Sequence, residues 1–312
     1  MFFENAIIGK NSWWRYVLTA ILTAFTLFIL INIAAYAISY FNLIDNETLV
    51  GFNKAMQNIP NDISKTLVFS VVMGVLIIIL FIFLFFVKLI HKKPILSIIT
   101  SRQSFDFKRF FISFGIFFIL LFFASAPLYF NGALSYNYSF EKFMPLLLIA
   151  LILVPLQSAS EEIILRGYLH QAFGLLFKSK LVAFLLVIIV FTVMHFPNIE
   201  FETDFNRVLL DFLMASTLFG LIVVLDNGLE IAIGVHAANN VFAVLIVSIS
   251  DGSINTDAIF STTIVEVINI SIWYSVAFNI MVFAIFYKIY NWKFSTLFEP
   301  IFRNNKVSPP TK

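Results

Sequence analysis

Ionisable and amide side chains interrupt three of the most apolar stretches of the chain. They are Glu161, Glu162 and Arg166 in SASEEIILRGYLHQAF, His195 in FTVMHF, and His236 with Asn239 and Asn240 in GVHAANN. Carboxylates and imidazoles are the usual proton carriers in enzymes, and amide N–H groups stabilise developing negative charge. A charged side chain at the centre of a bilayer costs at least about 2.5–3.5 kcal/mol. Each of these residues therefore needs a partner or a function.

Structural explanations exist for each residue taken alone. Glu162 and Arg166 are spaced i, i+4 and would neutralise one another on one helix face. A single membrane histidine is often a hydrogen-bonded core residue, and asparagines often link neighbouring helices. One arginine does not neutralise two adjacent carboxylates, however, and Glu161 points about 100° around the helix from Glu162. The cluster as a whole therefore indicates a functional site.

The spacing along the chain brings Glu161 and His195 to the same depth. The segment Lys178-Ser179-Lys180 predicts a turn between two apolar helices. In an antiparallel hairpin centred on Lys178, the position opposite Glu161 is His195, and each lies roughly 25 Å from the turn at about 1.5 Å per residue. A carboxylate and an imidazole on neighbouring helices form a candidate acid/base pair.

A third helix supplies the other polar face, because His236 and Asn240 are spaced i, i+4. Two chemistries remain open for the set. Glu161 and His195 could act as an acid/base pair without a metal, or His195, His236 and Glu162 could hold zinc and leave one position for water. No His-Glu-x-x-His pattern is present, and the chain contains no cysteine, so neither a thiol nucleophile nor a Cys-ligated zinc site is available.

Composition identifies the medium in which these groups lie. Of 312 residues, 60% are hydrophobic and 12% are charged, and the mean hydropathy is +0.95. Soluble domains contain about 45–50% apolar and about 25% charged residues. The net charge of +2 and the lack of a long basic run give no indication of nucleic-acid binding. We therefore expect an all-α polytopic membrane protein in contact with the lipid bilayer.

Eight hydrophobic segments are candidate membrane helices, and the first is too long for the hydrophobic region of a cleaved signal peptide. They are residues 16–41, 67–89, 110–130, 143–177, 181–196, 208–225, 229–249 and 264–290. The fourth would be about 52 Å long against a hydrocarbon core of about 30 Å. Pro155 and the polar residues after it predict a break just before Glu161, with Ser158 or Ser160 capping the following half-helix. The tail, Asn304–Lys312, is predicted to be disordered.

Positive charges predict the orientation. If the N-terminus is cytoplasmic, the opposite side carries only Lys54, Lys65, Lys142 and Arg207 of the Lys and Arg residues. Cytoplasmic loops are rich in Lys and Arg. We therefore expect an integral protein of the cell (plasma) membrane with both termini cytoplasmic. Three further residues are interpreted as structural: His91 as part of a basic loop, His170 on a helix leading to the interface, and Asp211 as a partner of Arg207.

The three motifs together resemble the signature of the CAAX prenyl protease 2 (CPBP, or Abi) family of intramembrane proteases. The family pattern reads here as Glu161-Glu162-x-x-x-Arg166, Phe191-x-x-x-His195 and His236-x-x-x-Asn240, in the family order and without departure. The similar region is predicted to be a core at 143–249, preceded by helices at 1–142 and followed by a last helix and cytoplasmic tail at 250–312.

The resemblance implies a role for each matching residue. Glu161 and His195 would activate water for attack on a peptide bond, with Glu162 in the same site. His236 and Asn240 would stabilise the oxyanion. Arg166 and Phe191 would support the site. The substrate would be a membrane-associated protein or peptide.

Two other functions remain open. One is a non-enzymatic adaptor or a bacteriocin-immunity factor, since some similar proteins are linked to immunity. The other is a proton-coupled transporter that uses Glu161, Glu162 and Asp211, although related halves typical of transporters are not visible in the sequence.

Overall fold

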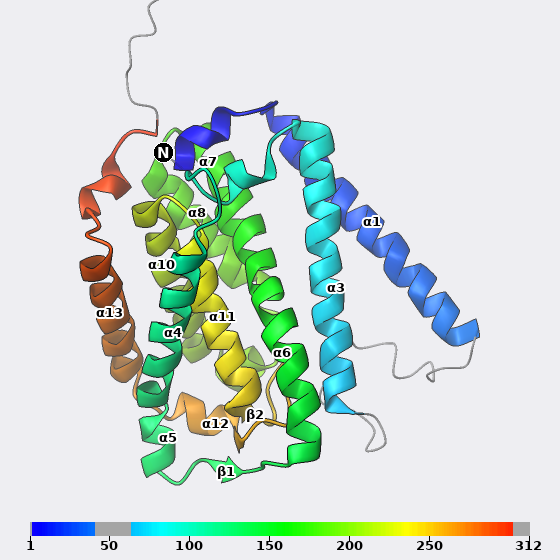
Figure 1. Cartoon of the computed structure of the whole chain (residues 1–312), viewed down its shortest axis with the longest axis vertical. Helices are drawn as coiled ribbons and strands as arrows, with labels where there is room; N and C mark the ends of the chain where they lie inside the picture. The colour runs from blue at the N-terminus through cyan, green and yellow to red at the C-terminus, as the bar shows by residue number, and fades with distance from the viewer. Residues whose placement is uncertain (1, 41–63, 302–312) are drawn as a thin grey trace, which may run out of the picture.

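The computed structural model describes residues 2–40 and 64–301, and for 34–40 the backbone alone. In this part of the chain most of the long helices lie side by side along a common direction, and α1 (Trp13–Tyr40) runs obliquely away from them (Figure 1). Six are long and apolar enough to cross a membrane, and two further apolar helices are shorter. The expected all-α polytopic fold is confirmed. The predicted disordered tail, Asn304–Lys312, lies outside the described residues.

The eight predicted segments correspond to the following helices. They are α1 (Trp13–Tyr40), α3 (Lys65–Phe86), α4 (Phe107–Ala124) with α5 (Ala126–Phe130), α6 (Phe140–Glu161) with η4 (Glu162–Leu169) and α7 (His170–Phe177), α8 (Lys180–Met194), α10 (Phe205–Asp226), α11 (Glu230–Leu245), and α12 (Ile264–Ile268) with α13 (Ile272–Ile289). The last predicted segment is thus divided in two. The seventh ends as a helix at Leu245, because residues 247–249 form a strand.

Short elements connect the helices at both ends of the bundle. They are η1 (Phe2–Ile7), η2 (Val87–His91), η3 (Ile95–Ile98), α9 (Glu200–Thr203) and η5 (Phe294–Phe298), with strands β1 (Ser135–Tyr136), β2 (Val247–Ile249) and β3 (Phe260–Thr262). The strands form a small sheet in the order β1-β3-β2, antiparallel between β1 and β3 and parallel between β2 and β3. This sheet lies at the end of the bundle away from the N-terminus (Figure 1).

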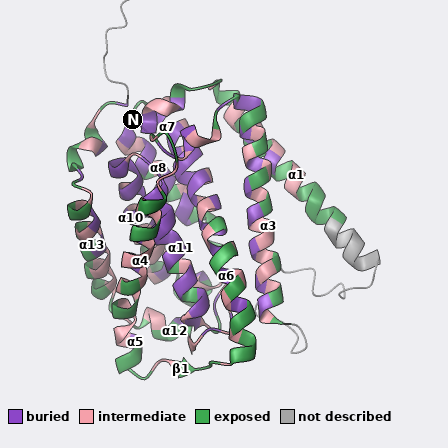
Figure 2. Ribbon diagram, in the orientation of Figure 1, coloured by how far each residue is buried: buried purple, intermediate pink, exposed green. Residues whose placement is uncertain are grey.

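Helix α11 forms the centre of the bundle, and every residue from Glu230 to Ala238 is buried (Figure 2). It packs against α4 and α6. The approach to α4 is close at Gly234, where a Cβ atom would lie 2.5 Å from the backbone oxygen of Phe110. At the start of α11, Arg102 forms ion pairs with Asp226 at 2.8 Å and Glu230 at 3.0 Å. These contacts fix the depth and rotation of the helix that carries His236.

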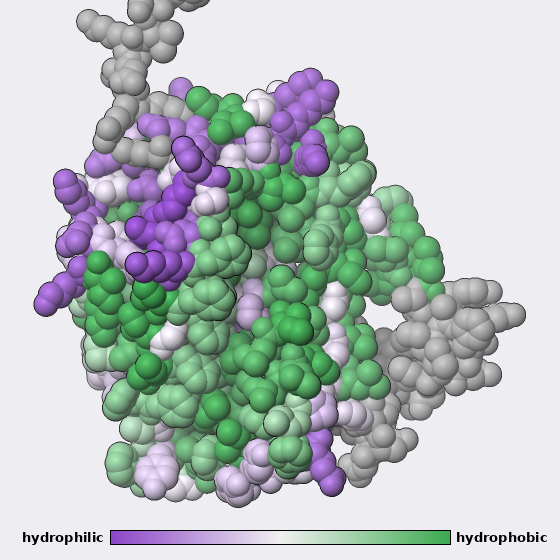
Figure 3. All heavy atoms as spheres, in the orientation of Figure 1, coloured by the Kyte–Doolittle hydropathy of each residue, from purple (hydrophilic) through white to green (hydrophobic). Residues whose placement is uncertain are grey.

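The surface has the character expected for a lipid-facing protein. A band of apolar residues covers the middle of the face in Figure 3, and hydrophilic residues gather toward the end that carries the N-terminus. Large apolar side chains on α1, α3 and α6, including Phe28, Phe81 and Leu148, are exposed. Lipid is the solvent in which such exposure is favourable.

The predicted break before the paired glutamates is wrong. Helix α6 continues through Pro145 and Pro155 to Glu161, and the Ser160 hydroxyl donates to the backbone oxygen of Leu156 at 2.8 Å instead of capping a new helix. Ser158 caps no half-helix here either, since the α-helix continues past it. The irregular segment is η4, a π-helix that begins at Glu162. A π-turn preserves backbone hydrogen bonding, whereas a break would expose backbone groups to an apolar medium.

The expected hairpin turn is present. Helix α7 ends at Phe177, and Lys178 adopts a left-handed conformation with φ of 53°. Ser179 then caps α8 by accepting a hydrogen bond from the backbone N–H of Val182 at 3.3 Å. The sequence before and after the turn remains helical, so α6, η4 and α7 run antiparallel to α8.

Candidate active site

Glu161 ends α6 at the point where the helix changes to the π-form, and its carboxylate faces two imidazoles. Its Oε2 lies 4.0 Å from Nε2 of His195 and 3.7 Å from Nε2 of His236. The side chain of Glu161 is 27% exposed and that of His195 is 21% exposed. Three helices therefore contribute to one partly accessible group of proton-exchanging side chains.

Glu162 is oriented differently, although it follows Glu161 directly. Its side chain is fully buried, and its Oε1 accepts hydrogen bonds from Nη1 of Arg166 at 2.5 Å and contacts Nδ1 of His236 at 2.8 Å. The widened turn of the π-helix begins at this residue. The two neighbouring carboxylates thus have separate environments: Glu162 is buried and bound through Oε1, and Glu161 faces the accessible side.

Arg166 is enclosed between Glu162 and aromatic rings. Its Nη2 donates to the hydroxyl of Ser216 on α10 at 3.0 Å. Its guanidinium carbon lies 4.4 Å from the ring centre of Phe191 and 5.2 Å from that of Phe219. A buried arginine is stabilised by a carboxylate and by aromatic faces together. This arrangement holds η4 against α8 and α10.

His195 lies directly after α8, where the helix ends. Its Nδ1 is 2.7 Å from the backbone oxygen of Phe191, an acceptor, so this nitrogen carries the proton. The ring lies between those of Phe191 and Phe212, with centres 4.4 and 4.6 Å away. In the neutral ring, Nε2 is then a hydrogen-bond acceptor directed toward Glu161.

His236 is held on both sides. Its ring stacks on Phe219 with centres 5.1 Å apart, while Nδ1 faces Glu162. Because an ionised carboxylate only accepts hydrogen bonds, Nδ1 is the donor in this contact. Nε2 remains directed toward Glu161.

Asn240 lies one turn after His236 on α11, as the spacing predicted. Its Nδ2 donates to Oε1 of Gln157 at 3.2 Å and lies 3.5 Å from the hydroxyl of Ser158. Gln157 in turn donates from Nε2 to Oε1 of Glu161 at 2.5 Å. Asn239 is exposed and donates to Oδ1 of Asn240 at 3.1 Å.

The structure thus brings the predicted site residues into one connected cluster. Sequence reasoning missed Gln157, Ser216, Phe212 and Phe219. Gln157 could have been found from its i, i+4 spacing to Glu161. The other three lie on α10, which carries no motif, so only the folded arrangement reveals them.

The suggested zinc set of His195, His236 and Glu162 does not fit a metal in this arrangement. In the described residues, no group of three or more His, Asp or Glu side chains is positioned to hold a metal ion. Glu162 and Nδ1 of His236 are directed at each other, and Arg166 occupies the same carboxylate oxygen.

The three residues interpreted as structural lie apart from this cluster. Asp211 accepts a hydrogen bond from Nε of Arg207 at 3.0 Å, as expected. His91, expected in a basic loop, is the last residue of η2 and is buried, with Nε2 2.8 Å from the hydroxyl of Tyr168 and Nδ1 2.8 Å from the backbone oxygen of Lys10. His170 is buried with its ring centre 4.9 Å from that of Phe3.

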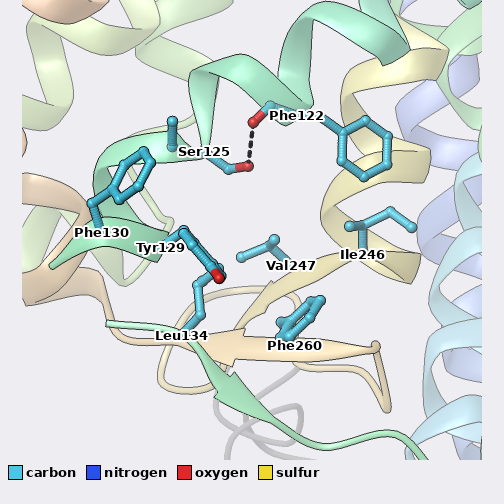
Figure 4. A pocket seen from close by; sticks show the side chains of 9 residues that line it. Phe122, Ser125, Tyr129, Phe130, Leu134, Ile246, Val247 and Phe260 are labelled. Carbon is cyan, nitrogen blue, oxygen red and sulfur yellow. Dashed lines mark hydrogen bonds between the residues drawn. The ribbon is translucent and has the colours of Figure 1, made fainter. Parts of the chain in front are cut away.

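An apolar cavity of about 310 Å³ lies elsewhere, between α4, α5 and the small sheet (Figure 4). Phe122, Tyr129 and Phe260 are among its lining residues, and the hydroxyl of Ser125 donates to the backbone oxygen of Phe122 at 2.9 Å. None of its lining residues carries a carboxylate, an imidazole or a basic group. It is not part of the candidate active site.

Comparison with known proteins agrees with the motifs. Residues 140–242 match the family model of the Rce1-like type II CAAX prenyl endopeptidases. The chain is also 29% identical over 253 residues to "Uncharacterized protein YyaK" of Bacillus subtilis (strain 168). The aligned region covers 79% of this chain and 82% of that protein. No solved structure matches. The expected family resemblance is confirmed for the region from α6 into α11, and the apolar helices and this match indicate an integral membrane protein.

Proposed function

We propose, from the Rce1-like match over residues 140–242, that this chain is an intramembrane endopeptidase that uses water activated by Glu161 and His195. At family level, the match supports a CAAX-protease-like endopeptidase. One observation carries the assignment of residues: Glu161 Oε2 lies within 4.0 Å of Nε2 of both His195 and His236. A partly accessible carboxylate between two imidazoles suits proton transfer.

The separation of Glu161 and His195 suits a shared water molecule. Their 4.0 Å distance is too long for a direct hydrogen bond, and a water about 2.8 Å from each would contact both. Glu161 would take a proton from this water as the water oxygen attacks the peptide carbonyl carbon. His195 would orient the water by accepting, at Nε2, a hydrogen bond from the water's second O–H group. The proton would then pass to the leaving amide nitrogen as the C–N bond breaks.

His236 and Asn240 would stabilise the oxyanion. To donate from Nε2, His236 must carry a proton there, and its Nδ1 already donates to Glu162. Both ring nitrogens of His236 would then act as donors, Nδ1 to Glu162 and Nε2 to the oxyanion. Asn240 Nδ2 supplies a neutral N–H from the same face of α11. Donors of this kind act strongly in a medium of low dielectric constant.

Glu162 and Arg166 would position these groups without contacting substrate. Glu162 fixes the direction of the His236 ring, and Arg166 neutralises Glu162 while contacting Phe191, one turn before His195. The substrate would be a membrane-associated protein or peptide. We further propose that the chain resides in the cell membrane with both termini cytoplasmic, because most Lys and Arg residues then lie inside.

The experiment compares protein termini in membranes of cells that produce wild type, Glu161→Ala, or Glu141→Ala. Glu141 is an exposed residue near the start of α6 and serves as the matched control. New termini are expected with wild type and Glu141→Ala and are expected to be missing with Glu161→Ala. Identical termini in all three membranes would overturn the proposal and would favour a non-enzymatic role.

A further inference from the structure

A directional chain of amide hydrogen bonds leads to the carboxylate of Glu161. Asn239 Nδ2 donates to Asn240 Oδ1 at 3.1 Å, Asn240 Nδ2 donates to Gln157 Oε1 at 3.2 Å, and Gln157 Nε2 donates to Glu161 Oε1 at 2.5 Å. Every amide donates in the same sense, toward the carboxylate. Such chains strengthen each hydrogen bond by mutual polarisation.

The carboxylate determines the direction of the whole chain. An ionised carboxylate only accepts hydrogen bonds, so Gln157 must present its NH₂ group to Glu161. The carbonyl oxygen of Gln157 then faces Asn240, which must present its own NH₂ group in return. The amide of Asn240 is thereby oriented with its nitrogen, and not its oxygen, on the side of α6.

Gln157 also determines which oxygen of Glu161 is available. Gln157 is only 4% exposed and lies one helical turn before Glu161 on α6. It occupies Oε1, whereas Oε2 is the atom that faces the imidazoles of His195 and His236. Loss of Gln157 would let the carboxylate rotate and would release Asn240 at the same time.

We infer that Gln157 is a positioning residue that couples Glu161 on α6 to Asn240 on α11. This inference rests on the proposed function, in which Glu161 is the base and Asn240 donates to the oxyanion. Gln157 itself contacts neither water nor substrate. Through its one buried side chain it orients Glu161 and Asn240, the two groups that contact water and substrate.

The first test measures cleavage of a quenched fluorescent peptide that spans the Glu161-dependent cleavage site, with the protein in liposomes. Gln157→Met keeps the approximate size of the side chain and removes both hydrogen bonds. We expect kcat to fall about 10- to 100-fold with KM changed less than about threefold, as for loss of a hydrogen bond to a charged group. Ser160→Ala, which removes a buried hydroxyl bonded within α6, is the matched control and is expected to keep wild-type kcat.

A double-mutant cycle then tests the coupling. If Gln157 acts through Asn240, the double variant Gln157→Met/Asn240→Ala will lie within about threefold of the more impaired single variant. The inference would be overturned, with the proposed function intact, by either of two results. One is a kcat of the double variant that is reduced by the product of the two single-variant fold-losses, and the other is wild-type kcat in Gln157→Met. Failure of the wild type to cleave would instead overturn the proposed function.

A second variant keeps the test valid if Gln157→Met does not fold. In Gln157→Glu the side chain has nearly the same shape, but at neutral pH its carboxylate repels the carboxylate of Glu161. When protonated, the new carboxyl can again donate to Glu161. The activity of Gln157→Glu relative to wild type is expected to rise as the pH falls from about 7 to about 5. The other titratable groups of the cluster, Glu162, Arg166, His195 and His236, are the same in both proteins. A ratio that does not change with pH would contradict the inference.

Discussion

The buried carboxylate of Glu162 contacts Nδ1 of His236 at 2.8 Å, across the packed surface between η4 and α11. Glu161, its neighbour in sequence, is the more accessible carboxylate and faces Nε2 of the same ring. The π-helix that begins at Glu162 gives the two glutamates these different environments. One carboxylate is therefore suited to orient a catalytic group, and the other is suited to exchange a proton.

Removal of Arg166 is expected to destabilise the protein. In Arg166→Met, Glu162 is left as a buried carboxylate without its cationic partner, and breaking a buried pair in this way costs about 3–5 kcal/mol. The free energy of unfolding in detergent measures the effect. The double variant Glu162→Gln/Arg166→Met is expected to recover most of the loss because it removes the charge as well. A loss below about 1 kcal/mol in the single variant would contradict this view of the pair.

A methyl group at Gly234 is expected to force α4 and α11 apart. In Gly234→Ala, the new Cβ would meet the Ser113 hydroxyl and the Phe110 backbone oxygen. Overpacking of this kind costs about 1–3 kcal/mol, and it would also displace His236, half a turn further along α11. Gly115→Ala on α4 is the control, because its Cβ would have no neighbour within 4 Å. Equal thermal stability of the two variants would show that the helices can separate without cost.

Because of Lys93, the free energy of unfolding is expected to rise as the pH becomes alkaline. It lies outside the membrane-spanning segments, and burial lowers its pKa from 10.5 to about 8. Between these values the unfolded chain holds a proton that the folded chain has released, so the free energy of unfolding rises with pH. Between pH 7 and pH 10, wild type should gain on the order of 2 kcal/mol relative to Lys93→Met.

Denaturant unfolding at the two pH values measures this gain. Lys88 is exposed, so Lys88→Met is the control and is expected to follow wild type at both pH values. If the difference between wild type and Lys93→Met stays constant from pH 7 to pH 10, the pKa of Lys93 is not lowered by burial.

Chelation of metal ions is expected to leave the proposed peptidase active. In the proposed mechanism, Glu161 takes the proton from water and passes it on, His195 orients the water, and no step uses a metal. The rate of peptide cleavage is measured after treatment with excess EDTA, with a zinc metalloprotease treated in parallel as a positive control. Loss of activity that added zinc restores would contradict the metal-free mechanism.

The depth relationship between Glu161 and His195 could be predicted from the sequence for a physical reason. The turn at Lys178 is short, both arms of the hairpin are helical, and helical rise per residue is nearly constant. Residue counting therefore gives the correct partner. The relation of His236 to these residues depended instead on how α11 rotates within the bundle, which spacing within one helix does not define.

Other features were not predictable in the same way. Pro155 and the polar residues after it suggested a break, but the apolar medium favours an unbroken helix, and the distortion appears at Glu162. His91 was expected in a loop because lysines follow it, yet its ring is buried between Lys10 and Tyr168, which are distant in sequence. The spacing of Gln157 to Glu161 was visible in the sequence, but its contact with Asn240 depends on how α6 packs against α11.

The cleavage rate of Glu161→Gln tests the central claim most directly. The substitution keeps the shape of the side chain, and the new amide can still form a hydrogen bond with Gln157. The amide cannot, however, accept a proton from water. With purified protein in liposomes and the peptide that spans the mapped cleavage site, kcat is expected to fall about 10²- to 10⁴-fold. Glu141→Gln is expected to retain the wild-type rate. Wild-type cleavage by a correctly folded Glu161→Gln would contradict the claim that Glu161 activates the attacking water.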